Sequence, residues 1–274
     1  MGVRLAPVLT VLAALVLAPS AVADVTQSTN WAGYAVHRTG PGFRAIEAWW
    51  RQPVLRCSRA QRTFSSYWVG LGGYSATSQA LEQVGTEADC NASGRMVSNA
   101  WYELIPAPSV PIALVPAPGD LMAAEVVVRG HLVSFSLQDV TRGRSFSRTV
   151  RAGAVDVSSG EWIVEAPSDC VTQTRCVTLP LADFGSASFE GAAIQSARGR
   201  WGAISDPSWP STRISLNPSS RVFVASGAAT SLGRAVASPL GPGGRTFSVS
   251  YSPLQVGVQP LALHGAVRLL GLAR

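Results

Sequence analysis

Carboxylates are the residues of this sequence best suited to acid–base chemistry. The chain has 16 acidic residues, and two of them lie in the segment Gly160–Pro167, which reads GEWIVEAP. If this segment is a strand, Glu161 and Glu165 point to one face while Trp162 and Val164 point to the other. Carboxylates are seldom placed under a sheet unless they are paired or functional. The alternative is that both glutamates lie on a solvated outer face.

Histidine and serine chemistry has less support. The chain has three histidines, at His37, His131 and His264, and no Gly-x-Ser-x-Gly motif, so a serine hydrolase is not favoured. It also contains no HExxH motif, no CxxC motif and no clustered histidines. We therefore expect no metal and no cofactor.

Two further segments carry polar side chains that could act together with a glutamate. Gln83 lies in Ala80–Gly85, and Glu103 ends the segment Asn99–Glu103. In the second segment Trp101 shares a face with Glu103 if the segment is a strand. Three tryptophans are of the kind that line a substrate groove, although each could equally belong to a core: Trp31, Trp68 and Trp101.

Short strands must position these residues. The chain is rich in turn formers, with 26 glycines and 18 prolines, and no amphipathic segment exceeds about three helical turns. Regularly spaced short strands predict an all-β sandwich or barrel. The expected strands are Ala45–Trp50, Ser66–Leu71, Leu121–Val128, His131–Asp139, Ser145–Val150, Glu161–Glu165, Arg221–Ala225 and Thr246–Tyr251.

The chain divides into three parts. Residues 1–23 combine a positive charge, a short apolar run and the sequence Ala21-Val22-Ala23, which predicts a secretory signal peptide. Residues 24–253 are expected to form one domain, and residues 254–274 a tail that either adds an edge strand or is mobile. Within the domain, Pro106–Gly119 is expected to be a long extended loop because proline-dense chain does not suit a central strand.

Four cysteines allow three disulfide pairings, and the sequence does not choose among them. An exported protein favours disulfides, and we expect the local pairs Cys57–Cys90 and Cys170–Cys176. The net charge of +6 comes from scattered arginines. Two arginine groups, at 51–62 and 142–151, could bind an anionic surface, but they are more typical of a solvated face. We therefore expect no nucleic-acid partner and no membrane partner after signal cleavage.

The ordered motifs of the chain resemble those of the glutamic peptidases (the eqolisins, peptidase family G1), whose members include fungal acid endopeptidases. No single motif is highly specific, but six follow one another at compatible spacing over residues 30–165. They are Asn30–Gly33, Trp68–Gly72, Leu81–Gly85, Ala100–Glu103, Gly119–Asp120 and Glu161–Glu165.

The resemblance implies a concanavalin A-like sandwich of two antiparallel sheets with a groove across one of them. It implies that Glu165 and Gln83 are catalytic, that Trp31, Trp68 and Trp101 line the groove, and that Glu103 and Asn99 border it. A carboxylate can take a proton from water and return it to the leaving amine. A neutral amide can donate to the developing oxyanion.

The sequence also departs from the fungal pattern at two positions. Gly72 and Asn99 stand where those members have aspartates. With fewer neighbouring carboxylates, Glu165 should experience less like-charge repulsion, so its pKa should be raised less. We expect activity at acid pH, with an optimum less acidic than that of the fungal enzymes, and we assign Glu161 a structural role.

Two other functions compete with a secreted, monomeric endopeptidase that acts on polypeptides. A glycoside hydrolase would need two carboxylates within about 10 Å. Glu161 and Glu165 are roughly 13 Å apart along a strand, which leaves Glu103 with Glu165 across strands. A lectin-like binding module would need neither Gln83 nor Glu165.

Overall fold

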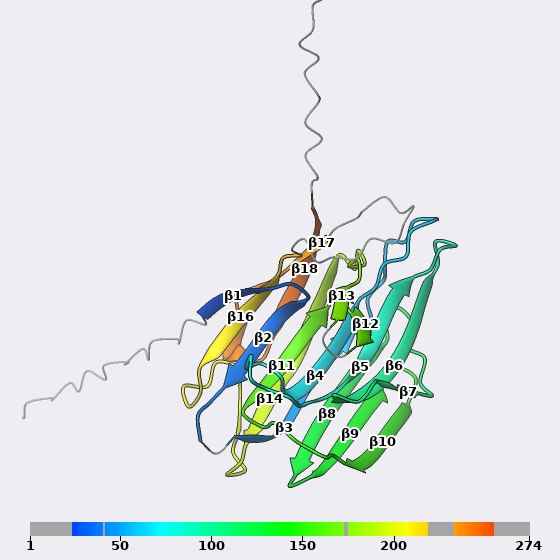
Figure 1. Cartoon of the computed structure of the whole chain (residues 1–274). Coiled ribbons are helices and arrows are strands. Elements are labelled where there is room, and N and C mark those ends of the chain that lie inside the picture. Colours follow the sequence, from blue (N-terminus) through cyan, green and yellow to red (C-terminus); the bar gives the residue numbers. More distant parts are fainter. Residues whose placement is uncertain (1–23, 41, 173–174, 219–232, 255–274) are drawn as a thin grey trace, which may run out of the picture.

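The structure is a computed structural model that describes residues 24–40, 42–172, 175–218 and 233–254 (Figure 1). The predicted signal peptide, the predicted strand Arg221–Ala225 and nearly all of the predicted tail lie outside these ranges. Within the described residues, no helix is long and apolar enough to span a bilayer.

Strands dominate the described chain, with one short 3-10 helix, η1, at Pro242–Gly244. The first nine strands are β1 (Asp24–Ser28), β2 (Trp31–His37), β3 (Phe43–Arg51), β4 (Ser66–Gly72), β5 (Leu81–Cys90), β6 (Met96–Ile105), β7 (Val110–Ile112), β8 (Leu121–Arg129) and β9 (Leu132–Asp139). The others are β10 (Arg144–Arg151), β11 (Ser159–Glu165), β12 (Ser168–Thr172), β13 (Arg175–Thr178), β14 (Ser186–Ser196), β15 (Trp201–Gly202), β16 (Ser211–Leu216), β17 (Gly233–Ala237) and β18 (Phe247–Pro253).

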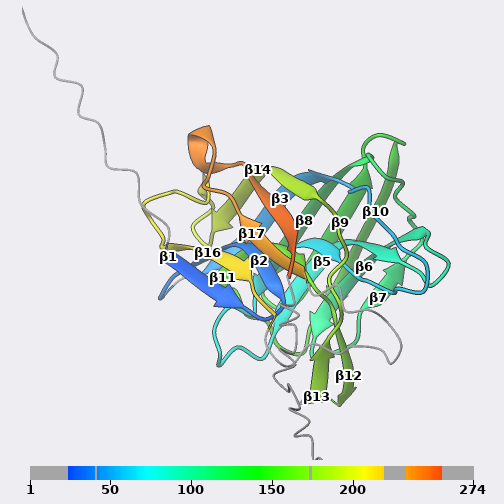
Figure 2. The same cartoon turned by 90° about the horizontal axis from the view of Figure 1, so that it is seen from above.

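The strands form two packed layers, as the sequence predicts. Hydrogen bonds link them in the order β10-β9-β8-β3-β14-β18-β17-β16-β2-β11-β4-β5-β6-β7, and β12 and β13 form a separate hairpin. The path folds back on itself, so that β3, β8, β9 and β14 pack against β4, β5 and β11 (Figure 2). Almost every pairing is antiparallel, but β1 joins β16 in parallel.

The main core lies between the two layers and follows from alternation along the strands. In β8, Met122, Ala124, Val126 and Val128 are buried while the residues between them are partly exposed. In β11, Trp162 and Val164 belong to the same core. Burying a large apolar side chain contributes about 1.5–3 kcal/mol, so this pattern fixes which face of each strand turns inward.

A second, smaller hydrophobic cluster lies on the opposite face of the layer that contains β2, β4, β5, β6 and β11. We call this face the site face. Its buried members are Ala35, Trp68, Leu81, Trp101, Ile163 and Ile214, and Trp31 and Tyr74 pack against them.

The proline-rich segment differs from the prediction. The sequence predicts one continuous loop over Pro106–Gly119, but Val110–Ile112 form strand β7, in which Pro111 lies opposite Trp101 of β6. The loop prediction was wrong for these three residues. Because β7 is the last strand of the sheet, its outer edge is unpaired, and an edge strand tolerates a proline.

One predicted disulfide is confirmed. Cys57, which follows β3, is bonded to Cys90 at the end of β5. The backbone of the β12–β13 hairpin places Cys170 opposite Cys176, but the side chains of these two residues lie outside the described part of the structure.

Candidate active site

Cross-strand register determines which side chains are neighbours on the site face, where three successive rows run across β2, β11, β4, β5 and β6. The first row consists of Trp31, Glu165, Ser66, Glu87 and Asn99. The second consists of Gly33, Ile163, Trp68, Gly85 and Trp101. The third consists of Ala35, Glu161, Gly70, Gln83 and Glu103.

Gly85 makes room for the tryptophan in the middle row. A Cβ atom at this position would lie 2.3 Å from the carbonyl oxygen of Tyr67 and 2.6 Å from Cβ of Trp68. Neither contact is sterically possible without a shift of β4. The glycine of the Leu81–Gly85 motif is therefore required by the close approach of Trp68.

Glu165 ends β11 and accepts two hydrogen bonds. Asn30 Nδ2 donates to Oε1 over 2.9 Å, and Trp68 Nε1 donates to Oε2 over 2.8 Å. Burial of the carboxyl group nevertheless raises its pKa to about 7, and Glu103 adds a smaller repulsive contribution. Desolvation therefore has a larger effect on this pKa than the like-charge repulsion on which the expectation from the sequence rests.

Gln83 is almost fully buried, with 4% of its surface exposed. Its Nε2 donates to Glu103 Oε2 over 2.5 Å, across the β5–β6 pair. Its Oε1 has no hydrogen-bond partner among the described residues. Burial raises the pKa of Glu103, and the bond from Gln83 opposes that effect. One N–H of the amide is thus held by Glu103, and the second remains for another acceptor.

The two predicted catalytic residues share a face but do not touch. Glu165 and Gln83 lie on strands separated by β4, and the row that contains Trp68 runs between their rows. Four residues of offset correspond to roughly 13 Å along the strands. A bound polypeptide must therefore lie between the two side chains to contact both.

The three predicted tryptophans are brought together with Glu165. Trp31 and Trp68 pack edge to face, with ring centroids 5.1 Å apart and planes at 77°. Trp101 lies in the same row as Trp68 and is 7% exposed, and its Nε1 has no partner within the described chain. Aromatic pairs of this geometry add about 0.5–1.5 kcal/mol beyond their burial.

Asn99 lies at the margin of the site, where it is exposed and faces Glu87. Glu87 was not predicted as a site residue, nor was Asp89, the next outward-facing residue of β5. Burial raises the pKa of Glu87, and it raises that of Asp89 to about 7. Alternation from Gln83 through residues 85, 87 and 89 could have identified both. Asn30 was also missed, although it begins a quoted motif.

Glu161 is separated from Glu165 on the same strand. Its side chain is completely buried, and neither carboxyl oxygen has a partner in the described structure. Burial raises its pKa well above the ordinary value, and Asp156 and Glu82 add repulsion. Burial also raises the pKa of Glu82 to about 8. The carboxyl group of Glu82 is therefore neutral in the folded protein at weakly acid pH.

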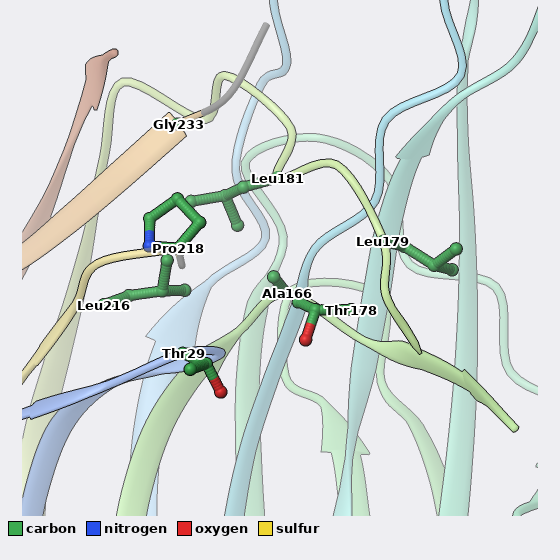
Figure 3. A pocket seen from close by; sticks show the side chains of 8 residues that line it. All are labelled: Thr29, Ala166, Thr178, Leu179, Leu181, Leu216, Pro218 and Gly233. Carbon is green, nitrogen blue, oxygen red and sulfur yellow. The ribbon is translucent and has the colours of Figure 1, made fainter. Parts of the chain in front are cut away.

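A cavity of about 680 Å³ lies beside Trp31 and Asn30. Its other lining residues come from β1, from the turn that follows it, from Tyr74–Ala76 and from Ile214. A second depression, drawn in Figure 3, is lined mainly by apolar side chains such as Leu181, Leu216 and Pro218. The second depression contains none of the site residues, whereas Asn30 and Trp31 line the first, so the first is the better candidate for substrate contact.

Comparison with known proteins gives a family match and solved structures of similar fold. A family model described as the Peptidase A4 family matches residues 29–230. No curated protein matches the sequence significantly. Scytalido-glutamic peptidase bound to a transition-state analogue is similar in structure, with 21% identity over 82% of this chain and 98% of that one and a TM-score of 0.64.

Two further solved structures share the fold. SCP-B, an eqolisin in complex with the tripeptide Ala-Ile-His, is 20% identical over 82% of this chain and 98% of its own, with a TM-score of 0.62. Aspergilloglutamic peptidase from Aspergillus niger is 24% identical over 69% of this chain and 99% of its own, with a TM-score of 0.50.

Proposed function

Because the chain belongs to the peptidase A4 family, the eqolisin-type glutamic peptidases, it is a peptide-bond hydrolase, and we propose that Glu165 and Gln83 are its catalytic pair. One observation carries this proposal. On the site face, the carboxyl group of Glu165 accepts hydrogen bonds from two side chains, Asn30 and Trp68, and burial raises its pKa to about 7.

In the proposed reaction Glu165 acts first as a base. Its carboxylate takes a proton from a water molecule, and the water oxygen attacks the carbonyl carbon of the scissile bond. The resulting carboxylic acid then gives the proton to the leaving nitrogen as the C–N bond breaks. A base with a pKa near the working pH suits both steps.

Gln83 stabilises the oxyanion that forms on the carbonyl oxygen. Glu103 holds one N–H of the amide, so the other N–H can donate to the oxyanion. Because an amide does not titrate, the donor persists at every working pH. One such donor typically contributes 10²–10³-fold to kcat.

We propose a working range near neutral pH, less acidic than the range that the sequence predicts. Below it, Glu165 becomes protonated because its pKa is about 7, and the base is lost. With rising pH up to about 8 the fold also loses stability, because the buried Glu82, whose pKa is raised to about 8, keeps a proton that the unfolded chain releases.

We also propose that the protein is exported and acts as a monomer on polypeptides. The charge, apolar run and small residues of the N-terminal segment support export. The disulfide between Cys57 and Cys90 fits an oxidising compartment.

Proteolysis of an unfolded protein substrate from pH 2 to 8 tests the proposal. Wild type is compared with Glu165→Gln, Gln83→Ala and the exposed control Glu190→Gln, with folding checked by circular dichroism. We expect cleavage by wild type and Glu190→Gln, at least 10²-fold slower cleavage by the two site variants, and resistance to a pepsin-type inhibitor. Undiminished cleavage by folded Glu165→Gln would overturn the assignment.

A further inference from the structure

We propose that the cavity beside Trp31 is a substrate subsite that accepts one large uncharged side chain of the polypeptide, aromatic or branched aliphatic. This inference rests on the proposed function, since it assigns a specificity-determining surface to the same site. It concerns a cavity that the catalytic residues themselves do not line.

The position of the cavity connects it to the catalytic centre. Asn30 and Trp31 line it, and Asn30 also donates to Glu165. Trp31 lies directly opposite Glu165 in the β2–β11 pair and packs on Trp68. A polypeptide whose scissile bond lies at Glu165 therefore has a neighbouring side chain within reach of the cavity.

The part of the cavity wall formed by Tyr74 is held in place before substrate arrives. Tyr74 stacks on His37, with ring centroids 4.9 Å apart and an angle of 10° between the planes. Its hydroxyl group donates to Thr212 Oγ1 over 3.0 Å. A preformed wall reduces the entropy lost when a side chain binds.

The chemistry of the lining selects against charge. The ten lining residues are all uncharged: the run 26–31, Tyr74, Ser75, Ala76 and Ile214. Trp31, Tyr74 and Ile214 offer apolar surface, and hydroxyl and amide groups complete the wall. A charged side chain would lose hydration here without gaining an opposite charge.

The opposite side of the site differs in chemistry. Beyond Glu165 the first row leads to Glu87 on β5, and Asp89 and Glu103 lie on the same face. The two sides of Glu165 thus present different surfaces to a polypeptide, one neutral and one rich in carboxyl groups. We therefore expect the preferred substrate side chains to differ between the positions that bind on the two sides of Glu165.

The size of the cavity also fits a substrate side chain. A volume of about 680 Å³ lies within the range of roughly 300–1,000 Å³ that is typical of ligand pockets. Filling apolar space in such a pocket commonly changes specificity by 10–200-fold for a single methylene group. A Leu or Phe residue should therefore be favoured over Gly or Asp at the matching position.

Internally quenched peptides, varied one position at a time among Gly, Leu, Phe, Lys and Asp, test the proposal through kcat/KM. We expect wild type to favour Leu and Phe at one position by at least tenfold. Thr26→Trp, which fills the cavity, should remove that preference while peptides with Gly there are still cleaved. Ala76→Glu should instead shift the preference toward Lys.

The matched control is Ser147→Glu, which adds the same charge at an exposed position of β10 in the other layer. It should keep the wild-type profile. Unaltered profiles in both Thr26→Trp and Ala76→Glu would overturn the subsite while leaving the proposed function intact. Absence of cleavage by folded wild type would overturn the proposed function, and the subsite with it.

Discussion

Trp68 donates a hydrogen bond from its indole nitrogen to Oε2 of Glu165 over 2.8 Å, although the two residues lie in different rows of the site face. The indole ring is completely buried in the smaller hydrophobic cluster of the site face. The bond therefore couples the packing of that cluster to the charge of the proposed catalytic base. A donor to a carboxylate stabilises the ionised form and lowers its pKa, which opposes the effect of burial.

Trp68→Phe should move the acid limb of the kcat/KM–pH profile to higher pH. Phenylalanine keeps most of the ring but removes the donor, so the pKa of Glu165 should rise above about 7. A shift of up to about one pH unit corresponds to about 1.4 kcal/mol. Trp101→Phe is the matched control, because the Trp101 indole nitrogen has no partner in the described structure. An acid limb that moves equally in both variants would contradict the prediction.

Glu103 should act by holding the amide of Gln83. In Glu103→Gln a carbonyl oxygen can still accept from Gln83 Nε2, so kcat should fall only a few-fold. Glu103→Ala removes the acceptor and frees the amide to rotate, so kcat should fall at least tenfold with KM less affected, since the lost interaction is made in the transition state. Equal losses of kcat in the two variants would show that the hydrogen bond between Gln83 and Glu103 does not account for the loss.

Alternation along single strands made much of the site predictable. The pattern of the GEWIVE segment predicts Glu161 and Glu165 on one face and Trp162 and Val164 on the other. The structure confirms it, since Trp162 and Val164 lie in the main core and Ile163 in the cluster on the site face. The same rule, applied beyond Gln83, would have found Glu87.

The register between strands and the long-range packing could not be predicted from the sequence. Nothing in the local pattern shows that Trp68 lies between the rows of Glu165 and Gln83, because the pairing of β4 with both β11 and β5 decides it. The desolvation of Glu165 likewise depends on atoms contributed by several strands. The strand β7 was missed because its proline is tolerated by an edge that only the folded sheet defines.

Removal of the disulfide between Cys57 and Cys90 should destabilise the fold without changing the chemistry of the site. The bond joins two cysteines separated by 33 positions in the sequence, and such a crosslink typically contributes about 2–4 kcal/mol. The double variant Cys57→Ser/Cys90→Ser should unfold at lower denaturant concentration, as followed by tryptophan fluorescence. Its kcat at low temperature, where it remains folded, should stay within a few-fold of wild type. An unchanged unfolding midpoint would contradict the prediction.

The stability of the folded protein should fall as pH rises from about 5 to 8. Glu82 is 1% exposed, and burial raises its pKa from 4.5 to about 8. The unfolded chain therefore releases this proton near pH 4.5, whereas the folded protein retains it up to about pH 8. Because the folded state binds more protons in this interval, the free energy of unfolding decreases with rising pH.

Glu82→Gln tests this directly, because glutamine is neutral at every pH and its side-chain oxygen can still accept from the backbone N–H of Asp156. The melting temperature of the variant should fall less between pH 5 and 8 than that of wild type. Each unit of pKa difference corresponds to about 1.4 kcal/mol, so the change should be visible by calorimetry. The control Glu190→Gln, at an exposed position of β14, should follow the wild-type curve. Parallel curves for Glu82→Gln and wild type would show that Glu82 does not contribute, and Glu161, whose pKa burial also raises, would be the next carboxyl group to replace.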